Sequence, residues 1–135
     1  MKRTSPERSY HKIARVLKTI SQPARLEILQ ALGTSKACVR HLEVCLGKRQ
    51  AYISQQLMIL RDTGLVTAGR DGRNIFNSLK DSTILELIQV SGHITQIPEN
   101  VILHPVTGGS LPGCNCPHCV PDGSQELTLD TAKIS

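Results

Sequence analysis

The fold is decided by residues 37–79, which read ACVRHLEVCLGKRQAYISQQLMILRDTGLVTAGRDGRNIFNSL. A short helix is predicted for residues 38–46, and the glycine of Gly47-Lys48-Arg49 starts a tight turn. A second helix is predicted from Gln50 to Asp62, where Thr63-Gly64 ends it. Two helices joined by so short a turn form a helix-turn-helix, whose second helix is built to enter the major groove of DNA.

A β-hairpin is predicted directly after the second helix. Residues 65–79 fold back around Arg70-Asp71-Gly72-Arg73, because Asp71 and Gly72 both tolerate the positive φ of a tight hairpin turn. A hairpin in this place is the wing of a winged helix-turn-helix. The predicted fold class is therefore mainly α with a small β-hairpin wing.

The whole chain is divided into three parts. Residues 1–8 are predicted to be a flexible N-terminus, although Ser5-Pro6-Glu7 has the residue types that start a helix. Residues 9–97 are predicted to form the winged-helix DNA-binding and dimerisation domain. Residues 98–135 form a C-terminal extension with a cysteine-rich CxCxxC cluster, in which residues 101–103 are expected to be a short extended segment.

The composition restricts the function classes. The chain has 135 residues, a net charge of +5 and a pI of about 9.1, a mild basic surplus that suits a polyanionic partner. Aromatic residues make up only 2%, which disfavours binding to single strands by base stacking. The N-terminus has no apolar signal-peptide core and no segment reads as a membrane span, so we expect a cytoplasmic protein without a membrane partner.

The second helix of the motif has one apolar and one polar face. Ile53, Leu57 and Leu60 lie at i, i+4 and i+7 and form an inward stripe. The opposite face holds Ala51, Tyr52, Ser54, Gln55 and Met58. Gln and Ser side chains can donate to and accept from base edges, so this face is suited to reading the major groove. The alternative is an ordinary solvated helix face; the flanking turn and hairpin favour the DNA interpretation.

Basic residues flank the motif at both ends. Lys48 and Arg49 precede the second helix, and Arg70 and Arg73 lie in the hairpin turn. Such cations can contact backbone phosphates or an adjacent minor groove. The alternative is a charged, soluble turn. We therefore expect phosphate contacts here if the second helix reads DNA.

Two helices are expected before the motif, one ending near Ile20 and one ended by Gly33, so the helix predicted to start at residues 81–83 is the fifth. Its apolar residues surround much of its circumference: Ile84, Leu85, Leu87, Ile88, Val90 and Ile94. The rest of so small a domain can cover only one side of such a helix. A second copy of the chain is the simplest partner for the other side, so the protein is predicted to be a homodimer.

Three of the five cysteines lie close together near the C-terminus, at Cys114, Cys116 and Cys119. In a reducing compartment this spacing indicates metal or redox chemistry rather than structural disulfides. Thiolates select thiophilic ions such as arsenic as As(III), cadmium as Cd(II), Pb(II) or Zn(II). Three sulfurs suit As(III) or Pb(II). A fourth ligand, from Cys38, Cys45, His104 or His118, suits tetrahedral zinc or cadmium.

The remaining candidate ligands have simpler alternatives. Cys38 and Cys45 are two helical turns apart and share a face of the first motif helix, so either could connect the cluster to the DNA-binding unit. Cys45 is the more readily explained as a small core residue. His118 is a ligand or a spacer, and His11 and His41 are expected at the surface.

The chain resembles the ArsR/SmtB family of bacterial repressors. The resemblance covers roughly residues 10 to 96 and rests on ISQPARLEIL at 20–29, ACVRHL at 37–42, AYISQQLMILRDTGLV at 51–66 and the Arg-Asp-Gly-Arg wing. It implies a homodimeric repressor that binds a double-stranded operator of imperfect two-fold symmetry and leaves when a metal ion or a thiol-reactive signal binds. By position in the family motif, DNA-contacting residues correspond to Gln50, Ser54 and Gln56.

The chain departs from the family pattern at its metal sites. Cys38 matches the first cysteine of the Cys-Val-Cys-Asp/Glu-Leu motif, but Arg40 and His41 replace the second cysteine and the acid. On the fifth helix Asp81 fits the family's interhelical zinc site, while Thr83 does not and His93 is one place out of register. The resemblance therefore implies no interhelical zinc site.

Three hypotheses remain after these observations. The first is a repressor that releases its operator when a thiophilic metal or metalloid effector binds Cys114, Cys116, Cys119 and Cys38. The second is a thiol-redox or sulfide-responsive repressor. The third is a structural metal module that mediates a protein contact. No phosphate loop, HExxH motif or organised nucleophile is visible, so an enzyme is not expected.

Overall fold

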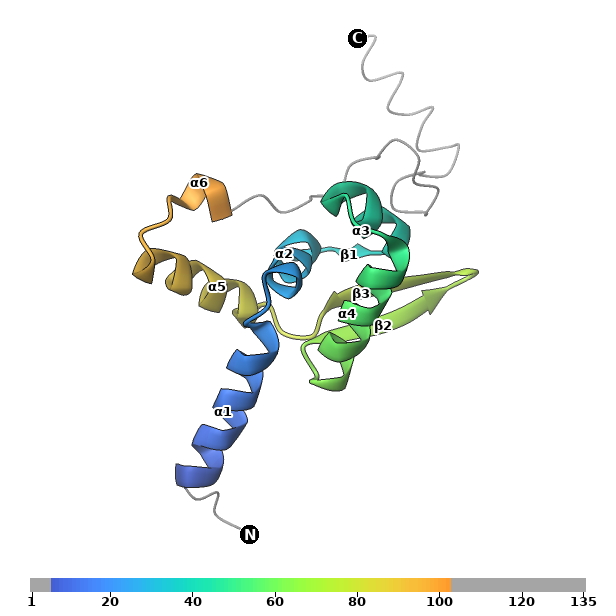
Figure 1. The fold of residues 1–135 in the computed structure, drawn as a ribbon. Coiled ribbons are helices and arrows are strands. Elements are labelled where there is room, and N and C mark those ends of the chain that lie inside the picture. The colour runs from blue at the N-terminus through green and yellow to red at the C-terminus, as the bar shows by residue number, and fades with distance from the viewer. Residues whose placement is uncertain (1–5, 103–135) are drawn as a thin grey trace, which may run out of the picture.

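The computed structural model describes residues 6–102 and shows a helical domain with a small antiparallel sheet (Figure 1). The predicted winged helix-turn-helix is confirmed. In chain order the elements are α1 (Pro6–Ile20), α2 (Pro23–Leu32), β1 (Lys36–Ala37), α3 (Val39–Leu46), α4 (Gln50–Asp62), β2 (Val66–Asp71), β3 (Asn74–Leu79), α5 (Thr83–Ile94) and α6 (Glu99–Ile102).

The hydrophobic core lies between α2, α3, α4 and the base of the sheet. Aliphatic side chains that are fully or almost fully buried build it: Ile28, Leu29, Leu32, Leu42, Ile53, Leu57, Leu60 and Val66. Burial of each such side chain stabilises the fold by about 1.5–3 kcal/mol before the entropy cost is counted. The apolar side of α4 is therefore packed in the core, while its opposite side is largely exposed.

The sheet has three strands in the order β1-β3-β2, all antiparallel. The strand β1 was not predicted, because two residues are too few to show an alternating pattern. It pairs Lys36 with Ser78 and Ala37 with Asn77. The wing, which we define as β2, β3 and their turn, is thereby attached to the start of α3.

The turn of the wing lies one residue further along than predicted. Asp71 pairs with Asn74 as the last residues of the two strands, so the two-residue loop is Gly72-Arg73. Gly72 has φ +64° and supplies the left-handed conformation that starts this loop. Asp71 consequently belongs to the strand rather than to the centre of the turn.

The two ends of the described region also differ from expectation. The helix α1 begins at Pro6, so residues 6–8 are helical although they were predicted to be flexible. This start agrees with the proline and acidic residue of the first turn. Residues 99–102, of which the last two were expected to be extended, instead form the single turn α6 behind Pro98, whose carbonyl accepts from the amide of Val101 at 3.0 Å.

Apolar side chains remain exposed on α1 and at the end of α5. Figure 1 shows α1 projecting away from the helical centre, and its exposed residues include Tyr10, Ile13 and Leu17. Val90 and Ile94 are exposed on α5. Between α1, α2 and α5 lies a groove of about 410 Å³ lined by Leu17, Ile20, Leu26, Ile88 and Ile97, among others. Within residues 6–102 no helix has the length and apolar composition needed to cross a bilayer.

Candidate nucleic-acid interface

The helix α4 presents a polar surface because its opposite side is anchored in the core. Ile53, Leu57 and Leu60 are completely buried. The side chains of four predicted contact residues are exposed at the start of the helix: Gln50, Ala51, Tyr52 and Gln55. Ser54 is half-buried on the same turn. The first two turns of α4 therefore offer amide, phenol and hydroxyl groups to a partner, with no acidic side chain among them.

A glycine turn sets the angle at which α4 leaves α3. Gly47 follows α3 in the left-handed conformation, with φ +63°, and its amide donates to the carbonyl of Glu43 at 2.9 Å. Lys48 follows it, and its Nζ lies 6.0 Å from the ring centroid of Tyr52. Arg49 then precedes the helix as its N-cap without a side-chain capping bond. The turn thus places two cations beside the exposed polar turns of α4.

Gln56 does not share the exposed face, contrary to the prediction from the family motif. Its side chain is 9% exposed, and its Oε1 accepts a 2.9 Å hydrogen bond from Nε of Arg25 in α2. Residues 53, 56, 57 and 60 follow the i, i+3, i+4, i+7 pattern of one helix face. Gln56 is therefore part of the buried stripe, and the internal hydrogen bond satisfies its amide oxygen.

The wing carries the other predicted cations at its tip. Arg70, Gly72 and Arg73 are exposed, and the hairpin extends beyond α4 on the side away from α5 (Figure 1). Sequence reasoning missed one further cation, Lys36 of β1. Its Nζ lies 5.4 Å from the ring centroid of Phe76, and together with Arg70 it lines a shallow groove of about 250 Å³ on the sheet. Its place on the sheet follows from strand pairing, which brings residue 36 beside residue 78, so no local pattern in the sequence could have indicated it.

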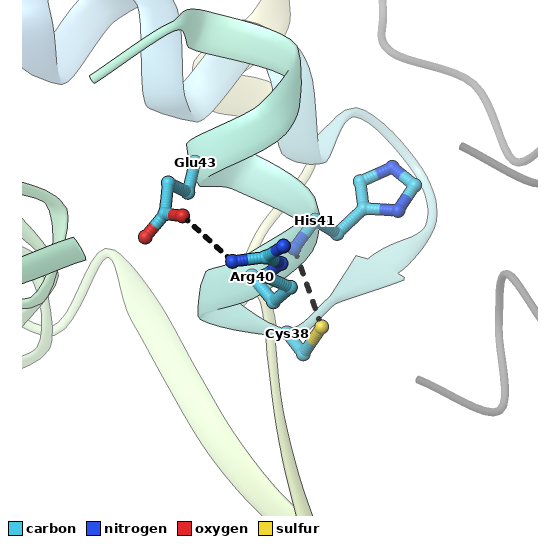
Figure 2. A network of polar contacts seen from close by, with 4 residues as sticks. All are labelled: Cys38, Arg40, His41 and Glu43. Carbon is cyan, nitrogen blue, oxygen red and sulfur yellow. Dashed lines mark hydrogen bonds and ion pairs between the residues drawn. The ribbon is translucent and has the colours of Figure 1, made fainter. Parts of the chain in front are cut away.

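The start of α3 is a compact polar network around Cys38 (Figure 2). Cys38 is the N-cap of α3, is 8% exposed, and its Sγ accepts the amide N–H of His41 at 3.4 Å. Arg40 Nη1 lies 3.1 Å from Oε1 of Glu43, one turn later. His41 is only 1% exposed, so the prediction that it lies at the surface is wrong. Cys45 is half-buried.

The predicted metal ligands Cys114, Cys116, Cys119 and His118, together with the alternative His104, lie outside the described residues. Within residues 6–102, no three His, Cys, Asp or Glu side chains converge closely enough to hold a metal ion. The family's interhelical position on α5 corresponds here to Asp81 and His93.

At that interhelical position the side chains have other partners. Asp81 Oδ1 accepts from the amide and the hydroxyl of Thr83, at 2.9 and 2.6 Å. These two hydrogen bonds lower the pKa of Asp81 below 3.8. His93 Nε2 lies 3.3 Å from Oε1 of Glu99, and both side chains are largely exposed. Asp81 thus bonds the first residue of α5, and His93 connects the last turn of α5 to α6.

Known proteins match both the sequence and the fold. Residues 22–68 match the family described as "Bacterial regulatory protein, arsR family". A biofilm growth-associated repressor from Agrobacterium fabrum is 36% identical over 93 residues, which cover 69% of this chain and 80% of that protein. The crystal structure of the transcriptional repressor BigR from Xylella fastidiosa superposes with a TM-score of 0.60 at 33% identity, covering 70% of this chain and 96% of that one.

A third likeness concerns the fold alone. The solution structure of a homodimeric winged helix-turn-helix DNA-binding domain from Mycobacterium bovis has a TM-score of 0.59 at 23% identity and covers 71% of this chain and 91% of that one. The likeness to the Agrobacterium repressor shows more than the fold, because the two sequences are 36% identical over most of both chains. These relatives are regulators of transcription, not enzymes. The chain therefore belongs to the ArsR/SmtB family of bacterial DNA-binding transcriptional repressors, as the motifs in its sequence predicted.

Proposed function

We propose that this repressor acts as a homodimer on an operator of imperfect two-fold symmetry, and that a thiophilic metal or metalloid ion releases it. In this proposal α4 and the wing contact DNA. Thiolates of Cys38, Cys114, Cys116 and Cys119 hold the effector. The observation that carries the DNA half is the exposure of Gln50, Ala51, Tyr52 and Gln55 over a helix whose other side is fully buried.

The charges around α4 support contact with a duplex. Lys48 and Arg49 precede the helix, and Arg70 and Arg73 end the wing, so cations stand on both sides of an uncharged reading surface. This is the arrangement in which phosphate contacts orient a protein while polar side chains read base edges. Gln50 and Gln55 are assigned to base edges and the four cations to phosphates.

The exposed apolar surface supports the homodimer. Leu17 of α1 lines the groove between α1, α2 and α5. Further large apolar side chains are exposed on the same two helices: Tyr10 and Ile13 on α1, and Val90 and Ile94 on α5. Contiguous apolar surface of this kind marks an interaction site in a water-soluble regulator. The related Mycobacterium bovis domain is a homodimer in solution. A second copy, packed through α1 and α5, covers this surface and pairs two α4 helices for two half-sites.

The chemistry of the cysteines supports the thiophilic effector. Three thiols within six residues are soft donors, which bind thiophilic ions in preference to ions that favour oxygen ligands. Cys38 suits the same role, because its Sγ already accepts an amide N–H, and such a donor stabilises a thiolate. Ligation of Cys38 alters the N-cap of α3, the helix that leads through Gly47 into α4. That is a route by which an ion can change how α4 is held.

The test uses the full-length chain with all cysteines reduced. Operator affinity is measured by fluorescence anisotropy while As(III), Cd(II), Pb(II) or Zn(II) is titrated, beside samples treated with peroxide or polysulfide. The triple variant C114S/C116S/C119S and the single variant C38S are expected to bind DNA as wild type does and to lose release by the ion. C45S is the matched control and is expected to respond normally.

Three results would overturn the effector assignment. Release by peroxide or polysulfide but not by ions identifies a thiol-redox repressor. Loss of folding in the triple variant identifies a structural metal module. Unchanged ion response in the triple variant removes these cysteines from the site altogether. Each result leaves the DNA half of the proposal to be judged by substitutions at Gln50 and Gln55.

A further inference from the structure

The side chain of Arg25 connects three helices. It projects from the first turn of α2, where its Nε donates to Oε1 of Gln56 in α4 and its Nη1 donates to the main-chain carbonyl of Thr19 in α1, both at 2.9 Å. A guanidinium group is planar and rigid, so two acceptors bound to it are held at a set distance and angle. Arg25 therefore fixes the end of α1 relative to the middle of α4.

A second contact lies beside the first. The hydroxyls of Thr19 and Thr63 are 3.3 Å apart, and Thr63 is the residue that follows α4. Each hydroxyl also lies 2.9 Å from the carbonyl oxygen four residues earlier, that of Arg15 or of Ile59. Because a hydroxyl carries one proton, one of the two hydroxyls donates to its carbonyl while the other donates to its partner hydroxyl. The last turn of α1 thus meets α4 at its middle through Arg25 and at its end through Thr63.

These contacts matter because little else on α1 is buried. Thr19 and Ile20 are the buried residues of this 15-residue helix, and the remainder projects from the domain (Figure 1). Only Ser21 and Gln22 separate it from α2. The direction of α1 relative to α4 is consequently decided at this junction, where the specific polar contacts are those of Arg25 and Thr19.

We infer that Arg25 is a positioning residue for operator recognition. By holding α4 against α1, it sets the separation and angle between the two α4 helices once α1 packs against a second copy. This inference rests on the proposed homodimer. Arg25 itself is not expected to contact DNA. Its hydrogen bond to Gln56 also explains why a polar residue lies in a stripe of α4 that is otherwise aliphatic.

If Arg25 had a purely structural role, replacing it would lower the stability of the domain without changing which spacing of half-sites the dimer prefers. The test therefore measures spacing. A duplex is first selected by the wild-type protein from a randomised pool, and versions are made with one base pair inserted or removed at its centre. The affinity for each duplex is measured with the wild-type protein and with two variants. R25M keeps the length of the side chain and removes its donors. K18M is the control and removes one exposed cation at the same junction.

The wild-type protein is expected to prefer the selected spacing, and K18M to behave in the same way. For R25M the ratio of affinities between selected and altered spacing is expected to fall by about tenfold, the size of effect of one mismatched base pair. Its dimerisation is expected to persist. The slope of log affinity against log salt is expected to be that of wild type, because no phosphate contact is removed.

Two outcomes overturn the inference: R25M with a wild-type spacing ratio and merely a lower melting temperature, or R25M with a smaller salt slope, which would make Arg25 a DNA contact. If R25M fails to fold, Arg25 and Gln56 are replaced together in the double variant R25M/Q56L. This variant buries no unpaired amide, and its ratio of affinities for the selected and altered spacings is measured in the same way. Failure of the proposed function is separate, since it appears in the wild-type protein as a monomer or as a selected site without two-fold symmetry.

Discussion

Asn77, in the middle of β3, accepts a 3.0 Å hydrogen bond at its Oδ1 from Nη1 of Arg61 in the last turn of α4. Its Nδ2 donates to the main-chain carbonyl of Ala37 in β1, at 3.4 Å, and its side chain is buried. Both halves of the amide are thus used, which is the condition for burying such a group without a large cost. One side chain joins the recognition helix, the wing and the strand that leads into Cys38.

Replacing Asn77 by alanine is expected to destabilise the domain by about 1–3 kcal/mol, because the carbonyl of Ala37 loses its partner and a cavity forms. Urea unfolding followed by circular dichroism measures this. S78A on the neighbouring, outward-facing position of β3 is the control and is expected to stay within about 0.5 kcal/mol of wild type. Equal losses in the two variants would show that the amide contributes no specific stabilisation.

The tip of the wing is expected to supply part of the salt dependence of DNA binding. R70Q and R73Q should each reduce the slope of log affinity against log salt by about one, because each removes one phosphate contact and the counterions it displaces. The preference among operator sequences should change little. K12Q, which removes an exposed cation from α1, is the charge-matched control. A slope equal to wild type in both wing variants would place the wing away from the duplex.

The parts of the fold that local sequence determines were predicted correctly. The aliphatic stripe of Ile53, Leu57 and Leu60 identified α4 and its buried side, and the turn glycines identified the wing. Periodicity reports the burial of residues that are themselves apolar, so it predicted these elements without knowledge of their partners.

The positions where prediction failed are polar residues whose partners are distant in the chain. Gln56 was named as a DNA contact by its position in the family motif, although it shares the buried stripe of α4 and bonds its partner Arg25, which lies 31 residues away. His41 was placed at the surface by residue type alone. Asn77 was not singled out, since its partners in α4 and β1 are brought together only by tertiary structure.

The start of α5 is expected to weaken at acid pH. The pKa of Asp81 is held below 3.8 by hydrogen bonds from Thr83, so the carboxylate stabilises the folded state above that pH and this contribution is lost as the pH falls through the lowered value. Melting temperatures of wild type and D81A should therefore differ at neutral pH and converge as the pH falls below the ordinary pKa of an aspartate and through the lowered value. D81N keeps an acceptor for Thr83 without a titrating group and should show no such convergence. A constant difference at every pH would contradict the assignment.

Charge placed on the exposed apolar end of α5 should separate the subunits. Ile94 is 77% exposed in the single chain, and in the proposed dimer it is covered by the second copy. I94D is expected to weaken self-association by about 100-fold or more, because the interface would have to desolvate a carboxylate. I75D, at a 48% exposed position on the wing, is the control and should leave the dimer intact. Sedimentation velocity over a range of concentrations measures both. A fully dimeric I94D with unchanged affinity would move the interface away from α5.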